Sequence, residues 1–104
     1  MIVFRSADLA AVERIAVAAA PLEACGLLEG TIQGSHYRVT GIHPSQNVAP
    51  DPADRFEVDP RLLLRLQKDL RGAPTAMIGI YHSHPRGPAV PSATDLAMAW
   101  QPAL

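Results

Sequence analysis

Two histidines and an aspartate lie close together near the end of this 104-residue chain. His82 and His84 are two residues apart, so on a β-strand both side chains leave the same face. Their Cα atoms are then about 6.5–7 Å apart, which lets two imidazoles reach one ion. Asp95 follows across a proline-rich loop and adds a carboxylate. Two neutral imidazoles and one carboxylate suit zinc and leave a fourth position for water.

Hydrolytic chemistry at such a site also needs a proton acceptor. Zinc lowers the pKa of a bound water to about 7, and a nearby carboxylate can take the proton. The candidates are Glu23 and Glu29. Glu23 has small and apolar neighbours, and poor solvation of its carboxyl would raise the pKa toward neutrality. Glu29 lies beside Gly30 and is interpreted as a surface charge at a strand end, so the residues favour Glu23 and leave Glu29 open.

Ser92 and Asp95 also have a purely structural interpretation. Ser-x-x-Asp is close to a capping box, in which a serine caps a helix and an acid lies three residues later. Capping and metal binding can coexist, because a carboxylate has two oxygens.

Three other reactive side chains are given no chemical role. Cys25 lies in an apolar stretch and is interpreted as packing rather than as a nucleophile. His36 and His43 have no acidic or cysteine neighbour on the hairpin expected there, and both are interpreted as surface residues.

The elements that must position these residues follow from hydrophobic periodicity and turn signals. Strands are expected over 1–4, 25–32, 37–43 and 75–83, with a turn at 33–35 that makes the middle two a hairpin, and a short extended piece over 56–58. Helices are expected from a cap at Ser6 to Pro21, from Asp59-Pro60 to Gly72, and from Ser92 onward. The nearly continuous apolar run before His82 is typical of a strand in the centre of a sheet.

This order of elements predicts one domain over residues 1–104. Its class is α/β, more narrowly an α+β mixed sheet flanked by helices. The net charge is −1 and the isoelectric point is near 6.4, so no basic face is available for nucleic acid and nothing favours a membrane surface. A single cysteine excludes an internal disulfide and favours a cytoplasmic location.

The chain resembles the JAMM (MPN+) zinc metallopeptidase family in its compact bacterial and archaeal form. The signature of that family is an upstream glutamate, then His-x-His-Pro, then Ser-x-x-Asp. Here ten residues separate His84 from Asp95, as in the family. Segment 21–30, Pro-Leu-Glu-Ala-Cys-Gly-Leu-Leu-Glu-Gly, is similar to the stretch that carries the glutamate, and the loop around Asn47 and segment 55–60 are similar as well.

The resemblance implies an MPN/cytidine-deaminase-like fold with zinc held by His82, His84 and Asp95. It implies that Glu23 activates the water and that Ser92 helps to stabilise the oxyanion of the tetrahedral intermediate. Family members hydrolyse peptide or isopeptide bonds after the C-terminal Gly-Gly of ubiquitin-like proteins. Prokaryotic relatives often process sulfur-carrier proteins of the ThiS or MoaD type. Because the family domain normally continues beyond the aspartate-bearing helix, this chain is expected to be short at its C-terminus.

Two other functions are weighed beside this one. RadC-type proteins carry a similar His-x-His-Pro and Pro-Ser-x-x-Asp segment and are associated with DNA, but this chain has no basic stripe. Family members that have lost the metal ligands act as non-catalytic protein-binding modules, and the complete ligand set argues against that role here. The sequence leaves open whether two copies associate as a homodimer, because an uncovered sheet edge can be completed by a partner.

Overall fold

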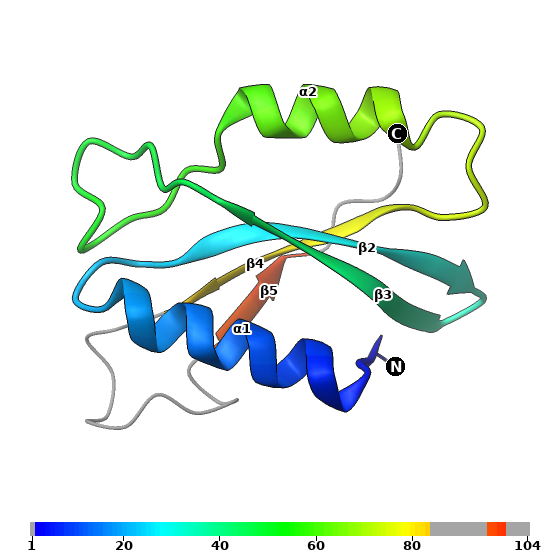
Figure 1. The fold of residues 1–104 in the computed structure, drawn as a ribbon, viewed down its shortest axis with the longest axis horizontal. Helices are drawn as coiled ribbons and strands as arrows, with labels where there is room; N and C mark the ends of the chain where they lie inside the picture. The colour runs from blue at the N-terminus through cyan, green and yellow to red at the C-terminus, as the bar shows by residue number, and fades with distance from the viewer. Residues whose placement is uncertain (1, 84–95, 100–104) are drawn as a thin grey trace.

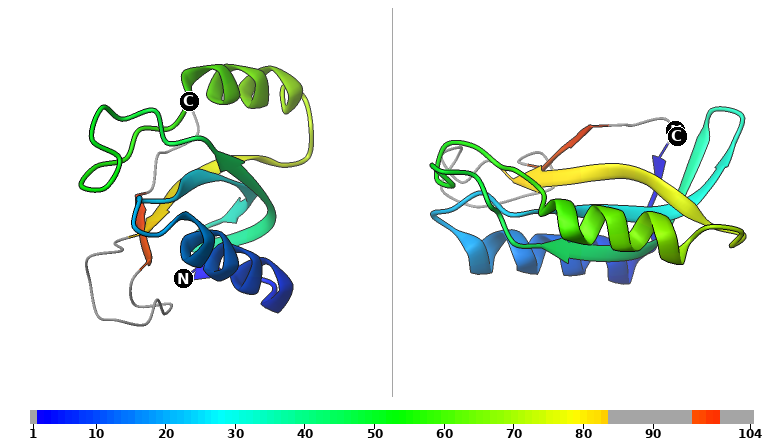
Figure 2. Two further views of the ribbon diagram at one scale, coloured as in Figure 1. Left: turned by 60° about the vertical axis from the view of Figure 1, so that its left-hand side comes forward. Right: turned by 90° about the horizontal axis from the view of Figure 1, so that it is seen from above.

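A single mixed sheet forms the body of the molecule (Figure 1). The computed structural model describes residues 2–83 and 96–99. The elements are β1 (Ile2–Val3), α1 (Ser6–Ala19), β2 (Cys25–Gln33), β3 (His36–Ser45), α2 (Pro60–Asp69), β4 (Ala76–Ser83) and β5 (Leu96–Ala99). The strand order is β1-β3-β2-β4-β5; β1 runs parallel to β3, and the other neighbours are antiparallel. The expected mixed sheet with flanking helices is confirmed, and Figures 1 and 2 show the sheet passing between α1 and α2.

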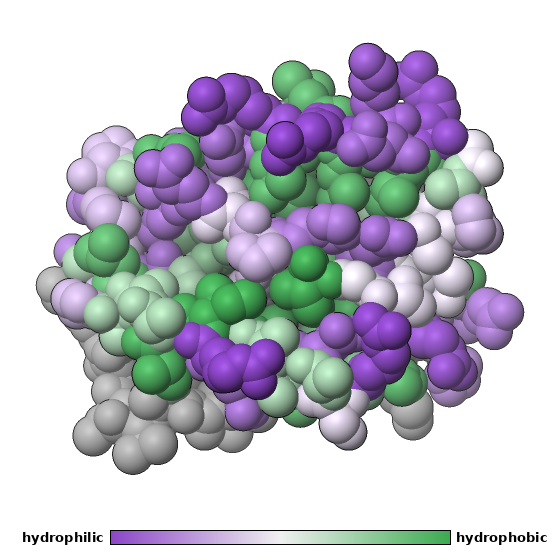
Figure 3. Space-filling view, in the orientation of Figure 1, coloured by the Kyte–Doolittle hydropathy of each residue, from purple (hydrophilic) through white to green (hydrophobic). Residues whose placement is uncertain are grey.

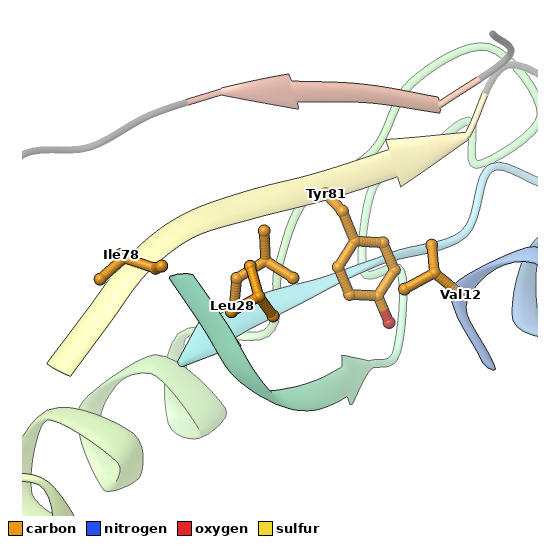
Figure 4. Packing of buried hydrophobic residues seen from close by; sticks show 5 residues of the cluster. Val12, Leu28, Ile78 and Tyr81 are labelled. Carbon is orange, nitrogen blue, oxygen red and sulfur yellow. The ribbon is translucent and has the colours of Figure 1, made fainter. Parts of the chain in front are cut away.

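Helix α1 packs on the sheet through its small apolar residues. Val12 and Ala16, one turn apart, are its buried positions. Val12 joins Leu28, Val39, Ile78 and Tyr81 in the core, as the close-up in Figure 4 shows for four of them. The helix begins at Ser6 itself, so the expected Ser6 cap is wrong by one residue; the capping position belongs to Arg5.

Helix α2 begins where the sequence indicates and ends at Asp69, three residues before the expected stop at Gly72. The carboxylate of Asp59 accepts a hydrogen bond from the backbone N–H of Arg61 at 2.9 Å, and Pro60 takes the first helical position. Gly72 adopts a positive φ of 78° just beyond the helix. Figure 3 shows polar side chains on the outer surface of α2 above a band of hydrophobic residues that faces the sheet.

The middle of the sheet is β2 rather than the strand that carries His82. Residues 25–28 of β2 are all buried, and β4 lies beside it as an inner strand. Gly26 of β2 lies opposite Tyr81 of β4, and a Cβ at Gly26 would collide with the tyrosine ring. The bulky ring that the apolar run contributes therefore fits only because the neighbouring strand has a glycine there.

The last described element contradicts a local expectation. The helix expected from Ser92 onward does not extend through Leu96–Ala99, because these residues form β5, antiparallel to β4 with Ser83 opposite Leu96. Pairing with β5 satisfies the backbone hydrogen-bonding groups along the outer edge of β4. A local capping pattern cannot predict this stabilisation, because it depends on a strand distant in the sequence. Ser92 itself lies outside the described residues.

Candidate functional site

Glu23 lies just before β2, at the end of the sheet where β4 finishes, and the loop between β3 and α2 lies at this same end (Figure 1). Glu23 is 5% exposed, and it is one of two buried polar residues in the described part of the chain. Its backbone N–H donates to the carbonyl of Pro52 at 2.7 Å, and its carbonyl accepts from Nδ2 of Asn47 at 2.9 Å. The loop therefore fixes the backbone that carries this buried carboxylate.

His82 faces Glu23 from β4. Its Nδ1 lies 3.8 Å from Oε1 of Glu23, and its side chain is 13% exposed. That distance is too long for a hydrogen bond, and the contact is an ion pair only when the imidazole is protonated. The ring of Phe56 stacks on the imidazole, with centroids 4.1 Å apart and planes 14° from parallel. Folding thus brings together two of the residues that the sequence singles out.

Ser83 ties the two strands together at the site. Its hydroxyl accepts from the backbone N–H of Ala24 at 2.8 Å, and its own N–H donates to the carbonyl of Ala24 at 3.0 Å. Ser83 is 4% exposed. Because the side chains of a strand alternate, Ser83 lies on the opposite face from His82 and holds the strand rather than facing Glu23.

The carboxylate of Glu29, the alternative proton acceptor, forms hydrogen bonds with Thr75 and His43. The hydroxyl of Thr75 donates to its Oε2 at 2.6 Å, and Nε2 of His43 lies 2.8 Å from its Oε1. These two hydrogen bonds, that of Thr75 above all, lower the pKa of the Glu29 carboxyl. His43 is thus not an isolated surface residue, because the register of β2 and β3 brings an acid beside it. His36 is exposed, as expected.

Cys25 behaves as a packing residue, as expected. It is 1% exposed and lies opposite His82 across the β2–β4 pair. Burial raises the pKa of its thiol, and the nearby Glu23 carboxylate raises it further, against a lowering by Ser45. A protonated, buried thiol is a poor nucleophile.

Two of the three predicted metal ligands, His84 and Asp95, lie outside the described residues, as does Ser92. Within residues 2–83 and 96–99, no three His, Cys, Asp or Glu side chains gather closely enough to hold a metal. His82 is therefore the one predicted ligand that the structure places. A partly buried imidazole beside a buried carboxylate is the donor chemistry that a zinc centre with an adjacent base requires, so the described part of the site fits zinc.

The sequence indicated the loop around Asn47 and segment 55–60 only as similar to the family, and it gave Asn47, Phe56 and Ser83 no role at this site. Asn47 is the sole asparagine of the chain and lies in a loop rich in proline, which is a usable signal. Phe56 is one of two phenylalanines and directly precedes an acid in a polar segment. Nothing local distinguishes Ser83, because its partner is a backbone amide 59 residues away.

Comparison with known proteins identifies the family to which the chain belongs. The chain belongs to the family of prokaryotic homologs of the JAB domain, whose model matches residues 6–104. It is 39% identical over 82 residues to a desampylase from Haloferax volcanii, covering 79% of this chain and 58% of that protein. It is also 39% identical over 80 residues to a probable TtuB-protein conjugate cleaving protease from Thermus thermophilus, covering 77% of this chain and 51% of that protein.

A solved structure has the same fold. The solution structure of protein DSY2949 from Desulfitobacterium hafniense matches with a TM-score of 0.74 and 39% identity, over 91% of this chain and 64% of that one. The chain thus spans between about half and three fifths of the length of the curated relatives named above. Among the helices of the described residues, none is long and apolar enough to cross a membrane.

Proposed function

We propose that this chain is a zinc-dependent hydrolase that cleaves peptide or isopeptide bonds at the Gly-Gly tail of ubiquitin-like or sulfur-carrier proteins of the ThiS or MoaD type. The observation that carries the proposal is the closeness of the buried Glu23 carboxylate to the partly buried His82 imidazole, with Oε1 and Nδ1 3.8 Å apart. Family membership and the relatives named desampylase and conjugate cleaving protease support it.

Each residue has a defined task in this reaction. His82, His84 and Asp95 would hold the zinc, which would supply a Lewis acid able to lower the pKa of a water and polarise a carbonyl. Glu23 accepts the proton of the attacking water and delivers it to the departing amine. Ser92 donates to the oxyanion that develops on the carbonyl oxygen.

The substrate class is suggested by the family resemblance and by the names of the relatives, and the confined position of the carboxylate is compatible with it. Glu23 is almost fully buried, so the bond to be cut must approach closely to reach it. A Gly-Gly sequence has no side chains and a flexible backbone, which allows that approach at small steric cost.

The decisive experiment separates the proton acceptor from the ligands. Glu23→Gln and Glu23→Ala are expected to keep zinc and to lower hydrolysis of a ThiS-like protein extended beyond Gly-Gly by at least about 100-fold, because the proton acceptor is lost. Cleavage is followed by mass spectrometry of the released tail.

Glu29→Gln is the matched control, because Glu29 is held by Thr75 and His43. It is expected to retain cleavage. Wild-type rates in Glu23→Gln would sink the assignment of the base, and salt-sensitive binding of DNA in place of any cleavage would favour the RadC-like alternative.

A further inference from the structure

The side-chain amide of Asn47 donates to three carbonyl groups at the site. Its Nδ2 lies 2.9 Å from the carbonyl oxygens of Glu23 and Arg55 and 3.3 Å from that of Pro52. An NH₂ group has two hydrogens, so one of them is shared, and the longer contact to Pro52 is the weakest. One of the two shortest bonds goes to the backbone of the proposed base.

Asn47 also holds both peptide groups that flank Phe56. The carbonyl of Arg55, which precedes Phe56, accepts from Nδ2. The N–H of Glu57, which follows Phe56, donates to Oδ1 at 3.1 Å. Asn47 further pairs with Val58 in an antiparallel bridge. The backbone of Phe56 is therefore anchored on both sides by one side chain.

The anchored Phe56 is in direct contact with His82. Its ring covers one face of the imidazole, 4.1 Å from it and nearly parallel. A stacked aromatic partner restricts rotation of the imidazole and keeps water from that face. The hydrogen bonds of Asn47 thus reach the backbone of Glu23 and the backbone on both sides of the residue whose ring stacks on His82.

We infer that Asn47 and Phe56 are positioning residues: Asn47 holds the backbone of Glu23 and Phe56 in place, and Phe56 fixes the ring plane of His82 for metal binding. The catalytic part of this inference rests on the proposed function, whereas the effect on the His82 ring does not. Groups that orient a metal ligand typically contribute about 10- to 100-fold in metal affinity.

The first experiment needs no metal. In NMR spectra of metal-free protein, the ring protons of His82 should be shifted upfield by the aromatic current of Phe56. Asn47→Ala removes every side-chain contact, and Asn47→Asp keeps the acceptor but loses the Nδ2 donors. Both variants should move the His82 signals downfield, as should Phe56→Leu, while Phe56→Tyr should keep the wild-type position. Gln46→Ala, at the exposed neighbouring position, is the matched control and should change nothing.

The second experiment measures function. Asn47→Ala, Asn47→Asp and Phe56→Leu should weaken zinc binding by about 10-fold or more, measured by competition with a chelator. In zinc-saturated enzyme they should lower kcat with little change in KM, because the substrate-binding surface is intact while the ligand and the base are misplaced. Phe56→Tyr should restore both quantities.

The outcomes are distinguishable. Unchanged His82 signals in a folded Asn47 variant would overturn the inference. Global unfolding of both Asn47 variants would overturn it as well, because Asn47 would then stabilise the whole domain rather than this site. Shifted His82 signals together with a wild type that neither binds zinc nor cleaves a tail would support the positioning role and refute the proposed function.

Discussion

Glu23 and Glu29 are six residues apart and differ entirely in their surroundings. Glu29 receives hydrogen bonds from Thr75 and His43, which stabilise its charged form and lower the pKa of its carboxyl. A carboxylate stabilised in this way is a weak proton acceptor. Glu23 is buried beside an imidazole and has its backbone held by the loop. The neighbours of each carboxylate, rather than their order in the sequence, favour Glu23 as the base.

At the residue scale, the ligand set can be tested by metal content. We expect wild type purified without added zinc to carry about one zinc per chain, as an open catalytic site with three protein ligands would. His82→Ala and His84→Ala should each lose it, since two remaining ligands hold zinc poorly. Elemental analysis of the purified proteins measures this directly.

His36→Ala is the control, since His36 is exposed on the hairpin far from Glu23 in the sequence and should not affect the metal. Stoichiometric zinc in His84→Ala would contradict the proposed ligand set.

The elements that carry the site are held in register by tight packing between β2 and β4. Gly26 lies opposite Tyr81, and Cys25 opposite His82. The tyrosine ring occupies the space that a side chain at Gly26 would need, and the ring is 1% exposed. A displacement of the backbone at Gly26 would therefore also displace the adjacent pair, Cys25 and His82.

At the element scale, Gly26→Ala should destabilise the fold by about 1–3 kcal/mol, because the added methyl group overpacks the space held by Tyr81. Urea unfolding of the metal-free protein measures this, and overpacking predicts a lower midpoint with an unchanged slope. Gly34→Asn is the control, because Gly34 has open space around it and a φ of 60°, which asparagine tolerates. Equal stability of Gly26→Ala and wild type would show that Tyr81 moves aside at no cost.

The molecule as a whole depends on contacts between distant segments. The Glu29 cluster joins three of them: β2, the end of β3 through His43, and the entry to β4 through Thr75. Because the folded-state pKa of Glu29 is lowered below its ordinary 4.5, the cluster stabilises the folded state above that pH. The stabilisation is lost as the pH falls through the lower folded-state pKa.

At this scale, Glu29→Gln should be less stable than wild type at neutral pH, and the difference should shrink to near zero well below pH 4.5. Chemical denaturation at both pH values gives the two free energies of unfolding. Asp69→Asn, at an exposed position at the end of α2, should show no comparable difference. A pH-independent deficit in Glu29→Gln would mean that packing, not the carboxylate charge, is responsible.

Local patterns predicted the parts of this fold and site that local physics determines. The period of two placed His82 on a strand, and Asp59-Pro60 located the start of α2, because both signals depend on adjacent residues. The pairing of His43 with Glu29 depends on the register of β2 and β3, including the irregularity after Glu29, which no local pattern specifies. The contacts of Asn47 with Glu23 and of Phe56 with His82 also depend on tertiary folding.

The hydrogen bonds of Asn47 have a consequence for how this sequence can vary. All of them end on main-chain atoms, which every residue type provides apart from the missing N–H of proline. The loop side chains of Ala49 and Ala53 are therefore not specified by these bonds. By the inference above, this loop contributes to the geometry of Glu23 and His82 through residues 47 and 56. Loop positions such as 49 and 53 can therefore change their surface chemistry without altering these contacts.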